Sequence, residues 1–186
     1  MTTRLRLGLA ALTLALIASV PAAAQYGPGA GGKAPYSVQP PGRNEAGRFD
    51  YYSMVMSWSP SYCATAQRAD PQCTGRGGRA YSFVLHGLWP QHDRGWPESC
   101  PTRERPFVPQ PIINRMLDIM PSPQLVIHEY RKHGTCSGLS PEAYFEMARK
   151  LYAGIKVPHR FDRPNQALTL SPQEVVHEFV TANPGL

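Results

Sequence analysis

Residues 49–58, FDYYSMVMSW, decide how the N-terminal half of this chain folds. Aromatic and apolar side chains alternate along the stretch, which is typical of a β-strand with one buried face. We therefore predict a half-buried strand here. The residues expected on its inner face are Tyr52, Met54, Met56 and Trp58.

A second strand is predicted for residues 80–85, AYSFVL, and is expected to stop at Gly87 and Pro90. The segment between the two strands, residues 59–78, is polar and is expected to form a long loop. Clear helix signals come only later in the chain.

Helices are predicted to dominate the second half. Residues 111–119 have an amphipathic pattern, and two later helices are expected to begin after Ser140 and Ser171, each of which precedes a first-turn proline. Ser171 and Glu174 also have the spacing of a capping box. Strands followed by helices predict an α+β domain.

The composition suits one globular domain behind an export signal. The chain has 186 residues, of which 42% are hydrophobic and 17% charged. Arg4 and Arg6 precede an apolar run that ends in small residues, which predicts a signal peptide over residues 1–24. The run is too short to span a bilayer comfortably, so we expect a periplasmic or secreted protein without stable membrane association after cleavage. Residues 25–47, rich in Gly and Pro, are predicted to be a flexible leader, which leaves residues 48–186 as the folded domain.

Four cysteines in an exported chain favour two disulfides over metal ligation or free thiols. Four cysteines allow three pairings, and their spacing alone selects none of them. The formal charge of +6 is modestly basic, which gives weak support for a polyanionic partner such as a nucleic acid.

Residues 125–138, LVIHEYRKHGTCSG, place several ionisable groups directly after an apolar run. If residues 126–134 form a helix that ends at Gly134, each residue advances about 100° around the axis. Tyr130 and Arg131 then point away from a broad face that can converge on one bound group. The residues on that face are His128, Glu129, Lys132 and His133.

Two other interpretations of this cluster compete. The pattern H-E-x-x-H on a helix marks zinc peptidases, but here the second histidine follows the first by five positions, and a lysine between them would repel a cation. The cluster could also be a solvated helix face, with Glu129 paired to Lys132 or His133. A second stretch of the chain weighs against the solvated-face interpretation.

Residues 83–91, FVLHGLWPQ, place His86 at the end of the second predicted strand. A lone histidine in that position is more often structural than functional. Gly87, however, permits close backbone approach or an unusual φ, and Trp89 offers a flat surface for stacking a base. A histidine, a stacking surface and a cationic cluster together suggest catalysis on a phosphodiester.

Two motifs, FVLHGLWP (83–90) and HEYRKHGTC (128–136), resemble nearly letter for letter the active-site motifs of the ribonuclease T2 family, exported endoribonucleases with broad base tolerance. The stretch WSPSYC (58–63) is similar to the end of that family's first core strand and the cysteine that follows it. The resemblance covers roughly residues 48–139. It implies an α+β fold in which an antiparallel sheet carries the first motif and a helix carries the second.

The resemblance also implies roles for individual residues. His86 and His133 match the family's acid/base pair, and Glu129 and Lys132 match the groups that stabilise the transition state. His128 matches a phosphate-binding histidine, and Trp89 matches part of a base-binding wall. The disulfides that the resemblance implies are Cys63–Cys73 and Cys100–Cys136.

The implied reaction begins when a ribose 2′-hydroxyl attacks the adjacent phosphorus. One histidine removes the hydroxyl proton and the other protonates the leaving 5′-oxygen, which gives a 2′,3′-cyclic phosphate. RNA is the expected partner, no metal or other cofactor is required, and the protein is expected to be a monomer. The alternatives are an inactive relative that binds RNA or acts as an interaction protein and, third, a metal-dependent hydrolase.

The C-terminal end departs from the family pattern. Members usually continue past the second motif through further strands, whereas this chain ends soon after one capped helix. We therefore expect either a short form or an incomplete chain. If strands are missing, the uncovered sheet should lower stability.

Overall fold

The structure is a computed structural model that describes residues 44–66, 70–74, 80–162 and 168–185. The predicted signal peptide, and the predicted leader as far as residue 43, lie outside these ranges. No helix within the described ranges is long and apolar enough to cross a membrane.

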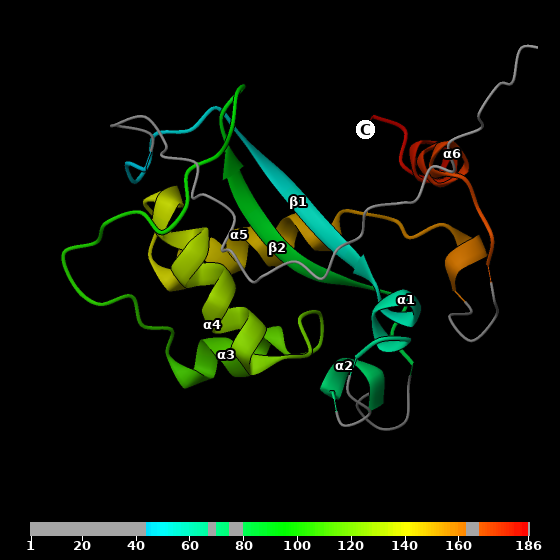
Figure 1. Ribbon diagram of the computed structural model, residues 1–186, viewed down its shortest axis with the longest axis horizontal. Coiled ribbons are helices and arrows are strands. Elements are labelled where there is room, and N and C mark those ends of the chain that lie inside the picture. Colours follow the sequence, from blue (N-terminus) through cyan, green and yellow to red (C-terminus); the bar gives the residue numbers. More distant parts are fainter. Residues whose placement is uncertain (1–43, 67–69, 75–79, 163–167, 186) are drawn as a thin grey trace, which may run out of the picture. The chain divides into compact units, whose positions relative to one another are not determined.

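Two antiparallel strands, β1 (Tyr51–Trp58) and β2 (Phe83–Gln91), form the sheet (Figure 1). The first predicted strand is confirmed, although it begins two residues later, at Tyr51. The second prediction was wrong at both ends, because β2 begins later and continues through Gly87 and Pro90. A two-stranded sheet leaves one edge of each strand unpaired, so a proline there need not remove a ladder hydrogen bond. His86 consequently lies inside the strand and not at its end.

His86 is the extra residue of a β-bulge. Val55 pairs with Gly87 and Met56 pairs with Leu85, so that His86 has no residue directly opposite on β1. Such an insertion bends a strand and redirects its side chains. The bulge therefore sets the direction of the one histidine in the strand.

The bulge also shifts the alternation of β2 by one residue. Leu85 and Leu88 both reach the hydrophobic core, whereas His86 and Trp89 both line a cavity. With regular alternation, residues three positions apart would lie on opposite faces of the sheet. Because of the inserted residue, β2 contributes side chains both to the hydrophobic core and to the cavity lining.

The segment predicted as a long polar loop contains two short helices, α1 (Ser59–Cys63) and α2 (Pro71–Thr74). The disulfide Cys63–Cys73 joins them. The side-chain amide of Gln72, a buried residue, donates to Ser59 Oγ at 3.0 Å. Local hydrogen bonds thus satisfy buried polar side chains within this segment.

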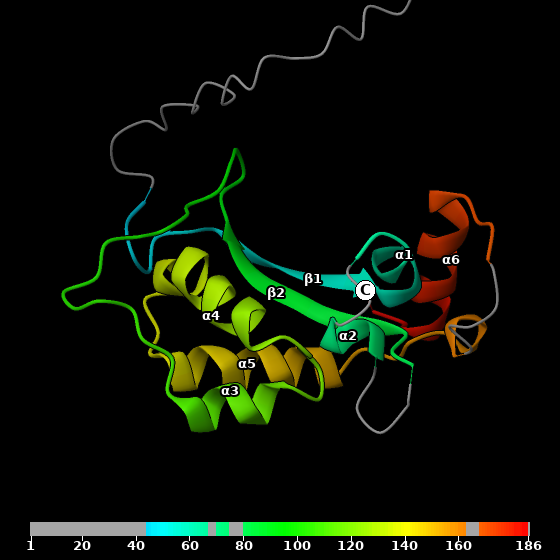
Figure 2. The ribbon, with the colours of Figure 1, turned by 60° about the horizontal axis from the view of Figure 1, so that its bottom comes forward.

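Three helices, α3 (Gln110–Met116), α4 (Pro123–Lys132) and α5 (Pro141–Ala153), pack on one side of the two strands (Figure 2). The amphipathic helix predicted over residues 111–119 is confirmed as α3, although it ends earlier. The predicted start of α5 after Ser140 is also confirmed, since the Ser140 side chain accepts a hydrogen bond from the N–H of the third residue of the helix.

The bounds predicted for the helix of the second motif, 126–134, were wrong. Ser122 caps α4 by accepting from Leu125 N at 3.2 Å, so that Pro123 begins this helix instead of closing the one before it. The helix ends at Lys132, and His133 is its C-cap.

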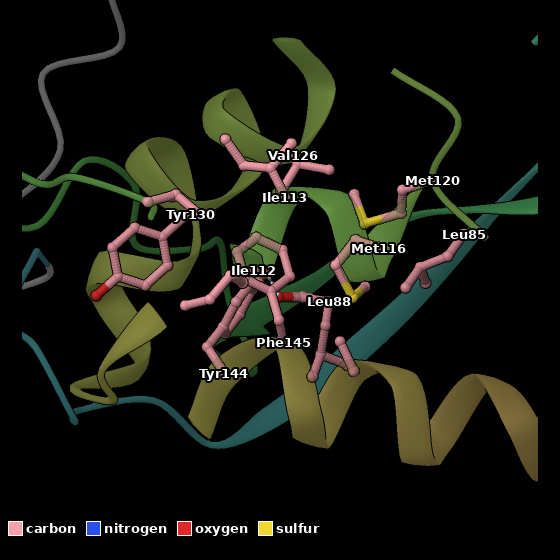
Figure 3. Packing of buried hydrophobic residues seen from close by; sticks show 12 residues of the cluster. Leu85, Leu88, Ile112, Ile113, Met116, Met120, Val126, Tyr130, Tyr144 and Phe145 are labelled. Carbon is pink, nitrogen blue, oxygen red and sulfur yellow. Dashed lines mark hydrogen bonds between the residues drawn. The ribbon is translucent and has the colours of Figure 1, made fainter. Parts of the chain in front are cut away.

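The hydrophobic core lies between β2 and these helices (Figure 3). Tyr144 of α5 is buried there and donates its hydroxyl proton to the carbonyl oxygen of Leu88 at 2.7 Å. Burial of this apolar surface fixes α4 beside β2. The core residues are Leu85, Leu88, Val108, Ile112, Ile113, Met116, Met120, Val126, Tyr130, Tyr144, Phe145 and Ala148.

Helix α6 (Pro172–Ala182) has the predicted capping box, in which Glu174 N donates to Ser171 Oγ at 3.3 Å and Ser171 N donates to Glu174 Oε2 at 2.7 Å. None of its residues, all of them described, is buried, although Phe179 packs against Phe83 with ring centroids 5.2 Å apart. The remaining described elements are the 3₁₀ helices η2 (Gly134–Ser137) and η3 (His159–Phe161). A small antiparallel sheet packed with helices confirms the α+β class.

Candidate active site

A cavity of about 440 Å³ lies between β2 and the C-terminal end of α4. All six residues that the resemblance assigned to catalysis or substrate binding line it, from two segments far apart in the sequence. Three further residues were not predicted as site residues; they come from the end of β2 and the loop that follows it. The lining residues are His86, Trp89, Gln91, Trp96, Glu98, His128, Glu129, Lys132 and His133.

His86 is held at both ring nitrogens. Its Nδ1 lies 3.1 Å from the hydroxyl of Ser57 on β1, and its Nε2 lies 3.5 Å from Oε1 of Glu129. Burial lowers the pKa of the His86 imidazole, and the positive charges of His128 and Lys132 act in the same direction. Sequence reasoning missed Ser57, whose only signal is a hydroxyl within an apolar strand.

Trp89 connects the strand side of the cavity to the helix side. Its indole N–H donates to Oε2 of Glu129 at 2.7 Å, and its ring stacks on His133 with centroids 4.8 Å apart and planes 20° apart. It also meets His86 edge-on, with centroids 5.7 Å apart. The indole thus contacts three catalytic candidates, and its predicted role in base binding stays a prediction.

Glu129 is a buried carboxyl, 1% exposed, at the floor of the cavity. Burial raises its pKa to about 7, although the hydrogen bond from Trp89 and the charge of Lys132 oppose that shift. Gly87 makes its position possible, because a Cβ there would overlap Oε2 of Glu129 and Nε1 of Trp89. Close approach, and not a positive φ, is therefore the reason for a glycine in the first motif.

His133 follows the last residue of α4 and is 5% exposed. Its Nδ1 is buried and has no hydrogen-bond partner among the described residues. An imidazolium would bury an unpaired N–H at that atom, which is unfavourable. Burial accordingly lowers the pKa of His133 to about 4, and nearby cationic groups, Lys132 first, add to the effect.

His128 and Lys132 stand one helical turn apart at the edge of the cavity. Lys132 is partly exposed, and its Nζ lies 3.7 Å from Oε2 of Glu98. The broad ionisable face predicted for this segment therefore exists, although the helix that carries it is placed differently. Among the described residues, no group of three or more His, Cys, Asp or Glu side chains is arranged to hold a metal ion.

The second disulfide supports the same region. Cys100 and Cys136 are bonded, and Ser99 N donates to the carbonyl oxygen of Lys132 at 2.7 Å. These contacts hold the loop after β2 against the end of α4. Both disulfide pairings implied by the resemblance are confirmed.

Comparisons with known proteins agree with this geometry. The Ribonuclease T2 family model matches residues 49–168. A ribonuclease of Aeromonas hydrophila is 43% identical over 132 residues, which cover 70% of this chain and 57% of that protein. A probable ribonuclease of Haemophilus influenzae is 30% identical over 132 residues, covering 64% of this chain and 48% of its own length. The chain thus spans about half the length of these curated relatives.

Solved structures show the same fold. A crystal structure of RNase NT in complex with 5′-AMP aligns with a TM-score of 0.54 at 26% identity and covers 73% of each chain. Ribonuclease MC1 from bitter gourd seeds aligns with a TM-score of 0.53 at 26% identity, covering 72% of this chain and 74% of its own. Since the family match includes both motifs and more than half of the sequence, the chain belongs to the ribonuclease T2 family.

Proposed function

We propose that this protein is an endoribonuclease that cleaves single-stranded RNA by metal-independent transphosphorylation. The observation that carries the proposal is the convergence of two histidines, His86 and His133, with Glu129 and Lys132 in one cavity. A pair of imidazoles can remove one proton and deliver another without a metal ion.

The environments of the two histidines support distinct roles. Burial lowers the pKa of His133 to about 4, so its imidazole is neutral at mildly acidic to neutral pH and acts as the base that accepts the proton of the 2′-hydroxyl. His86 acts as the acid: the bond from phosphorus to the 5′-oxygen breaks, and this oxygen takes the proton from the imidazolium. The product ends are a 2′,3′-cyclic phosphate and a 5′-hydroxyl. Water can then open the cyclic phosphate with the two roles reversed.

Lys132 and Glu129 act on the charge that develops at phosphorus. The ammonium of Lys132 at the cavity edge offsets the negative charge of the phosphorane. Because the pKa of Glu129 is about 7, its carboxyl is largely protonated at mildly acidic pH and can donate a hydrogen bond to a phosphoryl oxygen. In this proposal His128 binds the phosphate and Trp89 binds the base, and the presence of both side chains in the cavity lining supports these roles.

The disulfides also support an exported protein. Two disulfides suit an oxidising compartment, and together with the signal peptide predicted over residues 1–24 they support a mature protein in the periplasm or outside the cell, which we expect to be a monomer.

The test is a digest of single-stranded RNA and of DNA with the same sequence, each with and without EDTA. We expect the mature protein to cleave RNA in EDTA, to leave DNA intact because it lacks the 2′-hydroxyl, and to release a 2′,3′-cyclic phosphate first. Products with 5′-phosphates, or cleavage that EDTA abolishes, would contradict the proposal.

A further inference from the structure

Helix α4 has a second flank beside the one that faces the candidate active site. At about 100° per residue, Glu129 and His133 lie on one side of the ridge formed by His128 and Lys132, and Arg131 lies on the other. A second cavity of about 460 Å³ follows that other side. Its lining residues are Ser99, Gln124, Ile127, His128, Arg131 and Lys132.

The two cavities meet at the ridge, because His128 and Lys132 line both of them. Arg131 and Lys132 carry positive charge into the second cavity, and none of the described residues that line it is acidic. Glu98, which lies near Lys132, lines only the first cavity. The second cavity is therefore a cationic extension of the first.

Arg131 is the exposed cation of this extension. Its Nε lies 3.4 Å from the carbonyl oxygen of Pro106, and no carboxylate pairs with it among the described residues. The contact with Pro106 orients the side chain and leaves the two terminal nitrogens of the guanidinium for a ligand. Paired N–H groups of this geometry suit a phosphate.

We propose that this second cavity, with Arg131 as its principal ligand, binds the phosphate next to the scissile one in an RNA strand. The inference rests on the proposed ribonuclease function. The RNA strand crosses the ridge of α4, so that Lys132 lies between two consecutive phosphates of the RNA. Arg131 contacts the phosphate that does not react.

The test uses substrates with a single cleavable bond. A dinucleoside monophosphate has only the reacting phosphate. Two trinucleotides, each with one ribonucleotide among deoxynucleotides, add an unreactive phosphate on the 5′ side or on the 3′ side of the cleavable bond. A second pair of trinucleotides carries a neutral methylphosphonate in place of that added phosphate.

Arg131→Gln should lower kcat/KM by about three- to tenfold on one of the two trinucleotides, the magnitude of one exposed charged hydrogen bond. The dinucleotide and the methylphosphonates should change less than about twofold, since they lack the contact. On the affected trinucleotide, the slope of log kcat/KM against log salt should fall by about 0.7. Lys150→Gln on α5 is the matched control, because it removes the same charge from an exposed residue that does not line either cavity.

Equal losses on the dinucleotide and the trinucleotides, or no loss on either trinucleotide, would overturn the subsite. Binding of all-deoxy di- and trinucleotides, followed by fluorescence anisotropy, tests it without catalysis. If the wild-type protein cleaves none of the substrates, the ribonuclease proposal fails, while an Arg131-dependent gain in affinity from the added phosphate would still support the subsite.

Discussion

The strand side and the helix side of the cavity hold their histidines in opposite ways. On β2, the side chain of His86 is 38% exposed, and its Nδ1 lies beside the Ser57 hydroxyl. At the end of α4, His133 is 5% exposed, stacks on Trp89 and has an Nδ1 without a hydrogen-bond partner among the described residues.

The difference shows how two identical side chains acquire different proton affinities. A hydroxyl can rotate to accept from an imidazole N–H or to donate to a bare nitrogen, so Ser57 can accompany His86 with or without a second proton. His133 Nδ1 has no such partner in the part of the chain that the structure describes, and burial disfavours the charged form of this imidazole. The helix side thus favours a base and the strand side an acid.

Loss of either histidine should have the largest effect. His86→Ala and His133→Ala are each expected to lower turnover by about 10² to 10⁴, the usual contribution of a positioned acid or base. The loss of turnover is measured from the steady-state cleavage of a dinucleoside monophosphate. The double variant should lose less than the product of the two losses, because the residues act together. A His133→Ala protein with wild-type turnover would remove the helix side from the mechanism.

The pH dependence of kcat/KM should separate the two sides next. The base must be neutral, so activity should fall as the pH decreases through about 4, where His133 takes up a proton. The acid must be protonated, and the pKa of His86 lies below its ordinary value of 6.5, so activity at pH 8 should be at least about 30-fold below the maximum.

The pKa of Glu129 is about 7, so this carboxyl could also cause the loss of activity at alkaline pH. Glu129→Gln is therefore the control for the assignment of that loss to His86. If His86 is responsible, the variant should have a lower maximal kcat/KM but should still lose activity at alkaline pH. A kcat/KM that stays constant from pH 5 to pH 8 would contradict the assignment of His86 as the acid.

The sequence predicted the members of the site better than their arrangement. The sequence identified four catalytic candidates, because each motif is local and its residues match those of a known family: His86, Glu129, Lys132 and His133. The β-bulge at His86 could not be predicted, because it depends on pairing with β1. In addition, a glycine and a proline ordinarily indicate the end of a strand.

The same limit applies to the helices. Helices α5 and α6 both begin with Ser-Pro and a capping serine, yet α5 buries Tyr144, Phe145 and Ala148, whereas none of the described residues of α6 is buried. Caps are encoded by a few neighbouring residues, but burial depends on what the rest of the fold places against the helix.

Trp89 spans the two sides, and its replacement tests whether they are coupled. Trp89→Phe keeps a ring to stack on His133 but removes the N–H that donates to Glu129. We expect kcat to fall about tenfold, as for one hydrogen bond to a charged or buried carboxyl, with a smaller change in KM. Trp89→Ala should also raise KM if the ring binds the base. An unchanged kcat in both variants would leave base binding as the only role of the indole.

The smallest effect is expected at Ser57, on the strand side alone. Ser57→Ala should lower kcat/KM by about fivefold, since one hydrogen bond contributes about 1 kcal/mol. The hydroxyl accepts from Nδ1–H of the imidazolium, so its loss should lower the pKa of His86 and move the alkaline limb of kcat/KM to lower pH. Ser57→Thr should restore both values, and Ser53→Ala, which removes another hydroxyl from β1, should change neither. A Ser57→Ala protein with the wild-type pH profile would show that the hydroxyl does not position His86, and the contrast between the two histidines would then rest on burial.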